Sequence, residues 1–87
     1  MSETRCWLVE RTYNDRDLVT LVYATPDGER AVTKEVPMTA IANGSVSVTA
    51  AKEHDPDDLE PVEEGTVERY REEAARVATD HDPDDEI

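Results

Sequence analysis

LVTLVYATPDGERAVTKEV, residues 18–36, is the stretch that decides the fold. Two runs rich in Val, Leu and Thr, at 18–25 and 29–36, flank the tetrapeptide Thr25-Pro26-Asp27-Gly28. Pro at the second turn position has a fixed φ, and Gly accepts the left-handed conformation that follows, so the stretch predicts a hairpin with a three-residue loop. A third run of the same kind, 5–12, precedes the polar loop 13–17. The sequence therefore predicts a three-stranded antiparallel meander.

This turn predicts a register in which Tyr23 lies opposite Ala31, Val22 opposite Val32 and Leu18 opposite Val36. A similar pairing brings Trp7 opposite Tyr23 and Val9 opposite Leu21. One face of the sheet would then carry Trp7, Val9, Val19, Leu21, Tyr23 and Ala31, and the other Cys6, Leu8, Leu18, Val22, Val32 and Val36. Both faces are apolar, so both need a cover.

The second half of the chain predicts one amphipathic helix, 66–79, with an apolar stripe at Val67, Tyr70, Ala74, Val77 and Ala78. Before it, residues 37–44 suggest a short helix that Gly44 closes, and the alternation over 45–51 suggests a fourth strand. We therefore expect one α+β domain over residues 1–80, an antiparallel meander of three to four strands packed against one C-terminal helix. Residues 81–87 are expected to be an acidic, frayed tail.

The charge of the chain is extreme for its length. Asp and Glu number 22 against 9 Lys and Arg in 87 residues, a net charge of -13. Such self-repulsion opposes compaction unless salt shortens the Debye length from roughly 10 Å at 0.1 M to about 3 Å at 1 M. In this composition, and in the ending His81-Asp82-Pro83-Asp84-Asp85-Glu86-Ile87, the chain resembles the small acidic proteins of salt-loving archaea. The resemblance implies a cytoplasm rich in potassium chloride, and no particular activity.

Catalysis, cofactors and membrane insertion lack a sequence signature here. There is no nucleophile motif or glycine-rich phosphate loop, and only 3 Gly occur in the chain. No apolar run approaches the roughly 18 residues that span a bilayer, and Met1-Ser2-Glu3-Thr4 does not resemble a signal peptide. The single Cys6 is expected to be a small buried apolar residue. The sequence predicts a non-catalytic cytoplasmic protein without a cofactor.

Metal binding is one alternative, because the pentapeptide His-Asp-Pro-Asp-Asp occurs twice, at 54–58 and 81–85, and contains both histidines. Imidazole and carboxylate groups suit several divalent ions. The spacing matches no calcium loop, however, and Asp-Pro is a common turn dipeptide. If a metal were bound, the candidate ligands would be His54, Asp55, Asp57, His81, Asp82 and Asp84.

Nucleic-acid binding by the sheet is a second alternative. Five basic residues lie on or beside the predicted strands, with three aromatic residues near enough for a stacking platform. Seven acidic residues are interleaved with them in residues 1–36, and molar salt weakens phosphate contacts, which disfavours this function. The residues concerned are Arg5, Arg11, Arg16, Arg30 and Lys34, with Trp7, Tyr13 and Tyr23.

We favour a small interaction or accessory protein that forms a homodimer. One helix covers only one face of a two-sided apolar sheet, so a second copy of the chain would cover the other, by stacking or by edge-strand addition. The expected contact residues are Trp7, Val9, Leu21 and Tyr23, or Cys6, Leu8, Val22 and Val32 if the helix covers the first set.

Overall fold

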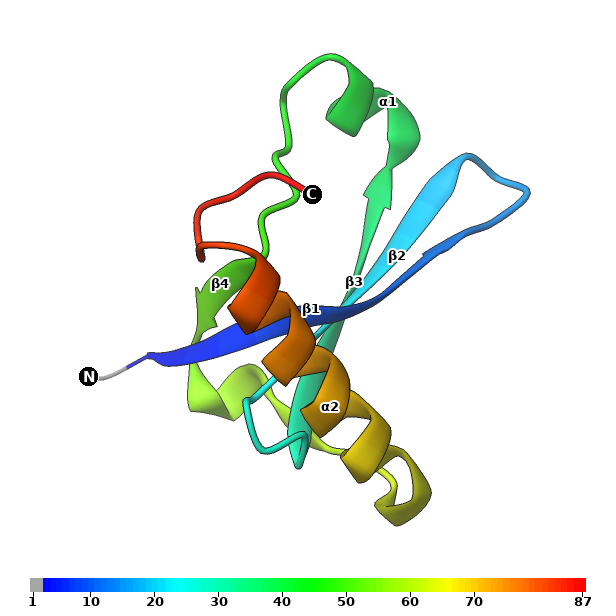
Figure 1. Ribbon diagram of the computed structural model, residues 1–87. Coiled ribbons are helices and arrows are strands. Elements are labelled where there is room, and N and C mark those ends of the chain that lie inside the picture. Colours follow the sequence, from blue (N-terminus) through cyan, green and yellow to red (C-terminus); the bar gives the residue numbers. More distant parts are fainter. Residues whose placement is uncertain (1–2) are drawn as a thin grey trace.

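The computed structural model describes residues 3–87 and shows an α+β fold, as the sequence predicts (Figure 1). A five-stranded antiparallel sheet has the order β4-β1-β2-β3-β5. In chain order the elements are β1 (Thr4–Tyr13), β2 (Leu18–Ala24), β3 (Arg30–Pro37), α1 (Met38–Ala42), β4 (Ala51–His54), the 3-10 helix η1 (Pro56–Asp58), β5 (Glu60–Pro61) and α2 (Glu64–Asp80).

The two outer strands of the sheet are consecutive in the sequence. β4 pairs with β1 and β5 pairs with β3, and only residues 55–59 connect them. Because this short connection joins opposite edges, the sheet is strongly curved and the connection closes its concave side. Leu59, at the end of the connection, is buried in the core cluster that contains Cys6 and Tyr23.

The hairpin between β2 and β3 differs from the prediction by one residue. Tyr23 pairs with Val32 and Ala24 with Ala31, so the predicted pairs of Tyr23, Val22 and Leu18 are wrong. The loop has four residues, because the Asp27 carboxylate accepts hydrogen bonds from the Thr25 hydroxyl at 2.6 Å and from the Glu29 amide at 2.9 Å. These bonds hold Glu29 in the loop, and the first strand pair is displaced to Thr25 and Arg30.

The pairing of β1 with β2 is also shifted, since a β-bulge lies between Leu8 and Glu10. Trp7 pairs with Ala24 and Leu8 with Tyr23, so the predicted pairs of Trp7 with Tyr23 and of Val9 with Leu21 are wrong. A shift of one residue exchanges the faces of a strand. Leu8 therefore shares a face with Tyr23, and Trp7 lies on the other face.

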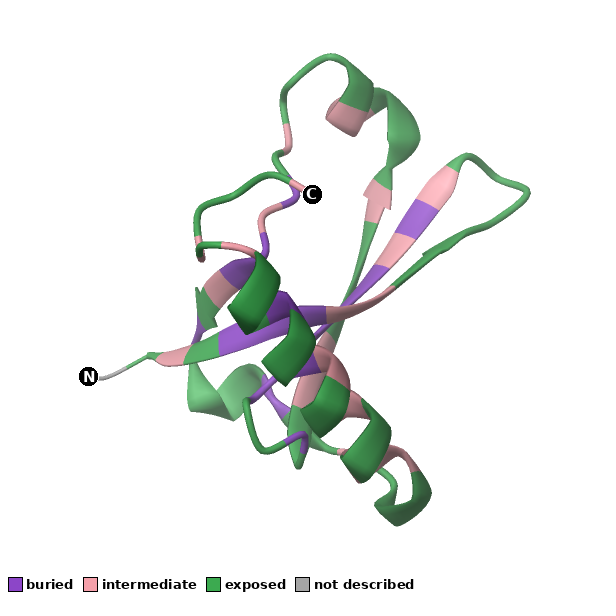
Figure 2. Cartoon of the chain, viewed as in Figure 1, coloured by how far each residue is buried: buried purple, intermediate pink, exposed green. Residues whose placement is uncertain are grey.

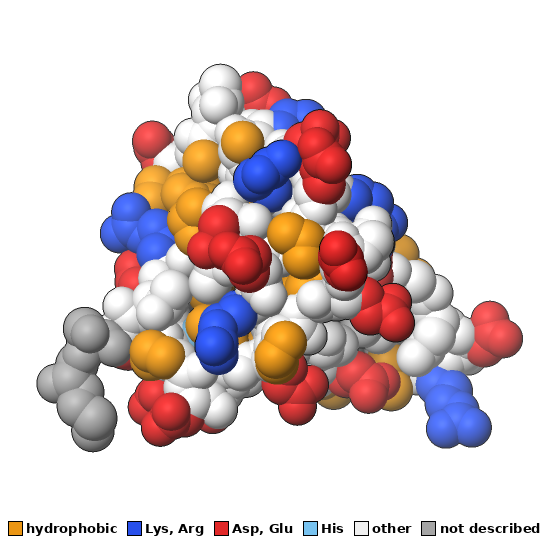
Figure 3. All heavy atoms as spheres, turned by 90° about the horizontal axis from the view of Figure 1, so that it is seen from below, with side chains coloured by type: hydrophobic (Ala, Val, Ile, Leu, Met, Phe, Trp, Pro, Cys, Tyr) orange, Lys and Arg blue, Asp and Glu red, His pale blue; other side chains and the backbone are white. Residues whose placement is uncertain are grey.

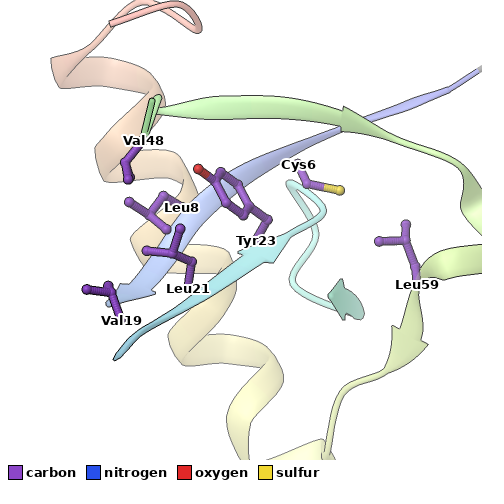
Figure 4. Packing of buried hydrophobic residues seen from close by; sticks show 7 residues of the cluster. All are labelled: Cys6, Leu8, Val19, Leu21, Tyr23, Val48 and Leu59. Atoms are coloured by element: carbon purple, nitrogen blue, oxygen red, sulfur yellow. The ribbon is translucent and has the colours of Figure 1, made fainter. Parts of the chain in front are cut away.

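The concave face of the sheet carries the larger core cluster. Its buried residues include a fully buried Tyr23, and they point into one space, with Cys6 and Leu59 toward one end and Val19 toward the other (Figure 4). The segment after α1 supplies the cover through Val48, and Ile41 of α1 packs at the margin. The buried members of the cluster are Cys6, Leu8, Val19, Leu21, Tyr23, Val48 and Leu59.

Helix α2 covers the convex face. It runs across β1 and turns Ala74 and Val77 toward Trp7, Ala50 and Ala51, while its other side is exposed (Figures 1 and 2). The predicted stripe is confirmed at Ala74 and Val77, and the helix is longer than predicted at its N-terminus. Gly28 in the β2–β3 turn lies against this helix so closely that a Cβ atom there would be 2.3 Å from the Val67 carbonyl oxygen.

Two further segments differ from the prediction. The fourth strand is Ala51–His54, and residues 45–50 are irregular apart from a single bridge between Thr49 and Glu86.

Glu86 of this bridge lies in the segment 81–87, for which the sequence predicts a frayed tail. In the structure the Ala51 amide donates to the Pro83 carbonyl at 3.0 Å, the Ala50 amide to the Asp85 carbonyl at 2.8 Å and the Ile87 amide to the Val48 carbonyl at 2.9 Å. The Ile87 side chain packs against both core clusters. The tail is thus part of the fold, because its last apolar residue has a place in the core.

Candidate functional site

The residues expected to contact a second copy lie inside a single chain. Tyr23 is 0% exposed, Leu21 2% and Trp7 8%, and Val9 is half-buried beside Trp7. The four do not share a face, and each face is covered by the chain itself. The alternative set Cys6, Leu8, Val22 and Val32 is buried or half-buried as well. The prediction that an apolar sheet face is left open is therefore wrong.

The predicted stacking platform is not available either. Trp7 and Tyr23 are buried, and only Tyr13, 58% exposed at the end of β1, presents its ring to solvent. Arg5 forms an ion pair with Glu53 at 3.1 Å, and Arg11 donates to the Ile87 carbonyl oxygen at 2.6 Å. The aromatic and basic residues that suggested nucleic-acid binding thus do not form one surface.

The six candidate metal ligands do not gather in space. Within residues 3–87 no group of three or more His, Cys, Asp or Glu side chains is arranged to hold a metal ion. The first pentapeptide instead forms η1, which Asp55 caps by accepting the Asp57 amide at 2.9 Å. In the second, the Asp85 carboxylate accepts the Asp82 amide at 2.9 Å. Both pentapeptides therefore form turns, which is the interpretation that the sequence favours over metal binding.

Cys6 is buried, as predicted. Burial and, secondarily, the negative charge of Glu53 raise the pKa of its thiol to about 11. Since the thiolate is the reactive form, Cys6 is an inert core residue at neutral pH.

His54 is the unusual polar residue of the core. His54 is 6% exposed, and within residues 3–87 neither imidazole nitrogen has a hydrogen-bond partner of normal geometry. The ring lies against Tyr23, with centroids 5.6 Å apart and planes tilted by 47°. Burial, followed by the positive charge of Lys34, lowers the pKa of His54. A buried polar group without a partner costs about 1 to 3 kcal/mol, so each such group in a native fold calls for an explanation.

Both lysines of the chain lie beside this histidine. Lys52 pairs with Cys6 and Lys34 with Leu21, and residues opposite each other in antiparallel strands share a face. Lys34, Lys52 and His54 therefore project from the concave face, the two lysines from strands at opposite sides of the curved sheet. Among residues 3–87 no carboxylate oxygen lies within 4.0 Å of either lysine, although the chain has 22 acidic residues. Burial, and then the charge of Lys34, lowers the pKa of Lys52.

The outer edge of β3 is a second feature of interest. The Arg30 carbonyl accepts from Thr25, on the β2 side, and the Glu29 carbonyl accepts from Val62, on the outer side. Backbone groups alternate along an antiparallel strand, so those of Thr33 and Glu35 point away from β2. β5 pairs only with Arg30 and Ala31, and in the described part of the chain nothing else bonds to these outer groups. The edge is open over Val32–Val36.

The surface beside this edge contains a depression. The depression, of about 220 Å³, lies where β5 leaves β3, and Val32, Thr33, Asp58 and Glu60 are among its lining residues.

Elsewhere the surface is a mixture of hydrophobic and charged side chains (Figure 3). On the face seen in Figure 3, hydrophobic side chains occur in small groups that charged side chains separate. No helix within residues 3–87 has the length and apolar character needed to cross a membrane.

The lysine pair could have been found from the sequence by counting, since Lys occurs only at 34 and 52. The convergence of the two lysines on His54 could not be predicted, because it depends on the curvature of the sheet.

Comparison with curated proteins and with solved structures gave no match. A family model described as a family of unknown function, DUF7967, matches residues 1–87. The chain therefore belongs to the family DUF7967.

Proposed function

We propose that this protein is a small, non-catalytic interaction module whose contact surface is the open outer edge of β3. The observation that carries the proposal is the unpaired backbone of Thr33 and Glu35 in a strand whose other edge is fully paired with β2. An exposed edge offers a row of donors and acceptors to which an extended segment of another chain can add as a further strand.

The charge at the edge indicates which segment fits. In a symmetric pair of two copies that bonds through Thr33 and Glu35, Lys34 of each copy lies directly opposite Lys34 of the other. Like charges directly opposite each other in a sheet are destabilising, whereas an opposite-charge pair contributes about 0.2 to 1 kcal/mol. We therefore propose an extended segment of a different protein, with an acidic residue opposite Lys34, as the occupant.

The composition suggests the setting. A net charge of -13 is best tolerated where salt is concentrated, so we propose that the module works in a cytoplasm rich in potassium chloride. Main-chain hydrogen bonds between strands depend less on salt than contacts with the phosphate backbone of a nucleic acid do, which suits an interaction in such a medium.

The test uses two variants of one residue. Thr33→Pro removes the outward amide and leaves the ladder with β2 intact, because the Thr33 amide does not point toward β2. Thr33→Val keeps the amide and is the matched control. Extended acidic peptides selected by display against the protein in molar KCl should bind the wild type and Thr33→Val and lose binding to Thr33→Pro.

Amide exchange then locates the contact. Bound peptide should slow exchange at Thr33 and Glu35 and leave the exposed loop 13–17 unchanged. Equal binding to both variants, or protection elsewhere only, would refute the edge. Sedimentation in molar KCl tests whether a second copy of the chain occupies the edge instead. A wild-type dimer that Thr33→Pro abolishes would assign the edge to a second copy.

A further inference from the structure

The concave face holds three basic side chains, those of Lys34, Lys52 and His54. Within residues 3–87 none of them has an ion-pair or side-chain hydrogen-bond partner. Placing like charges together is unfavourable by itself. Within residues 3–87, in contrast, four of the seven arginines form ion pairs with side-chain carboxylates: Arg5, Arg69, Arg71 and Arg76.

From this geometry we propose that Lys34, Lys52 and His54 form a binding site for a doubly charged oxyanion, the phosphate group of a ligand. The inference does not depend on the proposed function, although both use the Lys34 side chain, because the anion site needs Lys52 and His54 and does not need the open backbone edge of β3.

The burial of the three residues forms a gradient that suits such a site. Lys34 is exposed, Lys52 is half-buried and His54 is 6% exposed. An anion that enters between the lysines would be held by two ammonium groups at the mouth and would approach a ring whose two nitrogens have no partner. Charge-assisted bonds of this kind are about twice as strong as neutral ones. A phosphate group also has enough acceptor oxygens to bond all three side chains. A chloride ion is a single spherical acceptor and does not offer this arrangement.

The surroundings of His54 set the sign of the pH dependence. It is faced by Lys34 from β3, Lys52 from its own strand, Tyr23 from β2, Asp58 from η1 and, beyond Lys52, Cys6 from β1. In the empty site burial and the two lysines disfavour the imidazolium, whereas the backbone of Lys52, as a hydrogen-bond acceptor, and the charge of Asp58 favour it. A bound dianion reverses the effect of the lysines, so binding should be coupled to proton uptake by His54. By reciprocity, the anion binds more tightly as the pH falls through the range in which His54 titrates.

The experiment follows the two histidines by NMR in molar KCl, while sulfate replaces chloride at constant ionic strength. Sulfate stays doubly charged across the whole range, so its pH dependence reports the protein, and inorganic phosphate serves as the second probe. We expect the pKa of His54 to rise by about one unit on saturation, which corresponds to about tenfold tighter binding at low pH. His81, on the tail, should not respond, and its signal is identified with His81→Gln.

Three charge-matched variants complete the test. Lys34→Gln and Lys52→Gln should each weaken sulfate binding at least about tenfold, since each removes a charge-assisted hydrogen bond. Arg16→Gln removes the same charge from the exposed β1–β2 loop and should leave binding unchanged. Equal effects of all three variants, or equal shifts of both histidines, would overturn the proposal in favour of general screening. A His54 signal that sulfate does not move would overturn it directly.

Discussion

The Tyr23 hydroxyl donates a hydrogen bond to the Thr49 carbonyl oxygen at 2.9 Å and so connects the centre of β2 to the irregular segment that covers it. Tyr23 is fully buried, so the ring fills the core while its polar end satisfies a backbone group that has no strand partner on that side. This bond explains why residues 45–50 can lie over the sheet without forming a strand.

Replacing Tyr23 with Phe should therefore destabilise the fold. The substitution keeps the ring and leaves the Thr49 carbonyl without its donor, and a loss of about 1 to 3 kcal/mol is expected. Denaturant unfolding in molar KCl measures the effect. Tyr13→Phe removes a hydroxyl from an exposed ring and should change stability by less than about 0.5 kcal/mol. Equal effects of the two substitutions would show that the bond to Thr49 does not contribute.

Gly28 and Gly44 provide a matched pair for helix packing. Both have positive φ, 74° and 83°, but a Cβ atom on Gly28 would meet the Val67 carbonyl oxygen at 2.3 Å, whereas nothing lies within 4 Å of one on Gly44. Gly44→Ala should lose only the backbone strain, about 1 kcal/mol. Gly28→Ala should lose at least about 2 kcal/mol more, because the turn or α2 must move. Thermal unfolding of the two variants tests this difference, and similar losses would mean that α2 does not lie against the turn.

The buried His54 should make the fold less stable in mild acid. Its pKa is lowered in the folded state, so the unfolded chain takes up the proton first. The contribution is fully present above the ordinary value of 6.5 and is lost as the pH falls below it. His54→Phe should flatten the stability profile between about pH 7 and pH 5. Unfolding in chloride without sulfate measures both proteins across this range.

The tail can be tested by its effect on two amides. Removal of residues 82–87 takes away the carbonyl groups that accept from Ala50 and Ala51 and the side chain of Ile87. Hydrogen exchange at both amides should accelerate, while the Leu8 amide, which donates to the Ala50 carbonyl, should remain protected if the sheet stays folded. Unchanged exchange at Ala50 and Ala51 would mean that the tail is frayed, as the sequence predicts.

Salt should stabilise the fold through screening. We expect the melting temperature to fall when KCl is diluted below about 0.5 M, because the Debye length then grows and the excess negative charge is less screened. Replacing the exposed Asp57, Glu72 and Asp84 with their amides should weaken this dependence. Scanning calorimetry across a KCl series provides the measurement, and full stability of the wild type in dilute buffer would contradict adaptation to salt.

The local elements of the fold could be predicted from the sequence. The three long strands follow from their β-branched residues, α2 follows from the spacing of Ala74 and Val77, and Pro26 and Gly28 mark the turn. The register could not be predicted, because one side chain, Asp27, adds a residue to the loop and a bulge near Val9 shifts the next strand. Those two shifts decide which face Leu8 and Trp7 occupy, so the predicted contact surface was wrong.

The candidate site shows the same division. The sequence neighbours of His54 suggested metal ligation, whereas its spatial neighbours include Tyr23 and both lysines of the chain. β5, which has only two residues, Glu60 and Pro61, has no periodicity to detect. Its position depends on the short connection from β4 across the sheet, which is a property of the whole fold and not of the local sequence.

The connection between β4 and β5 also constrains the order in which the chain can fold. Arg5 and Glu53 pair across the first edge although 48 positions separate them, whereas the two hairpins of β1, β2 and β3 need only short loops. Closing a long loop has a larger entropic cost than closing a short one, so the meander should form first and residues 51–61 should attach to both of its edges in one late, cooperative step. Until that step Lys52 and His54 are not held beside Lys34, and a chain stalled there would expose the apolar side chains of its concave face to any neighbour.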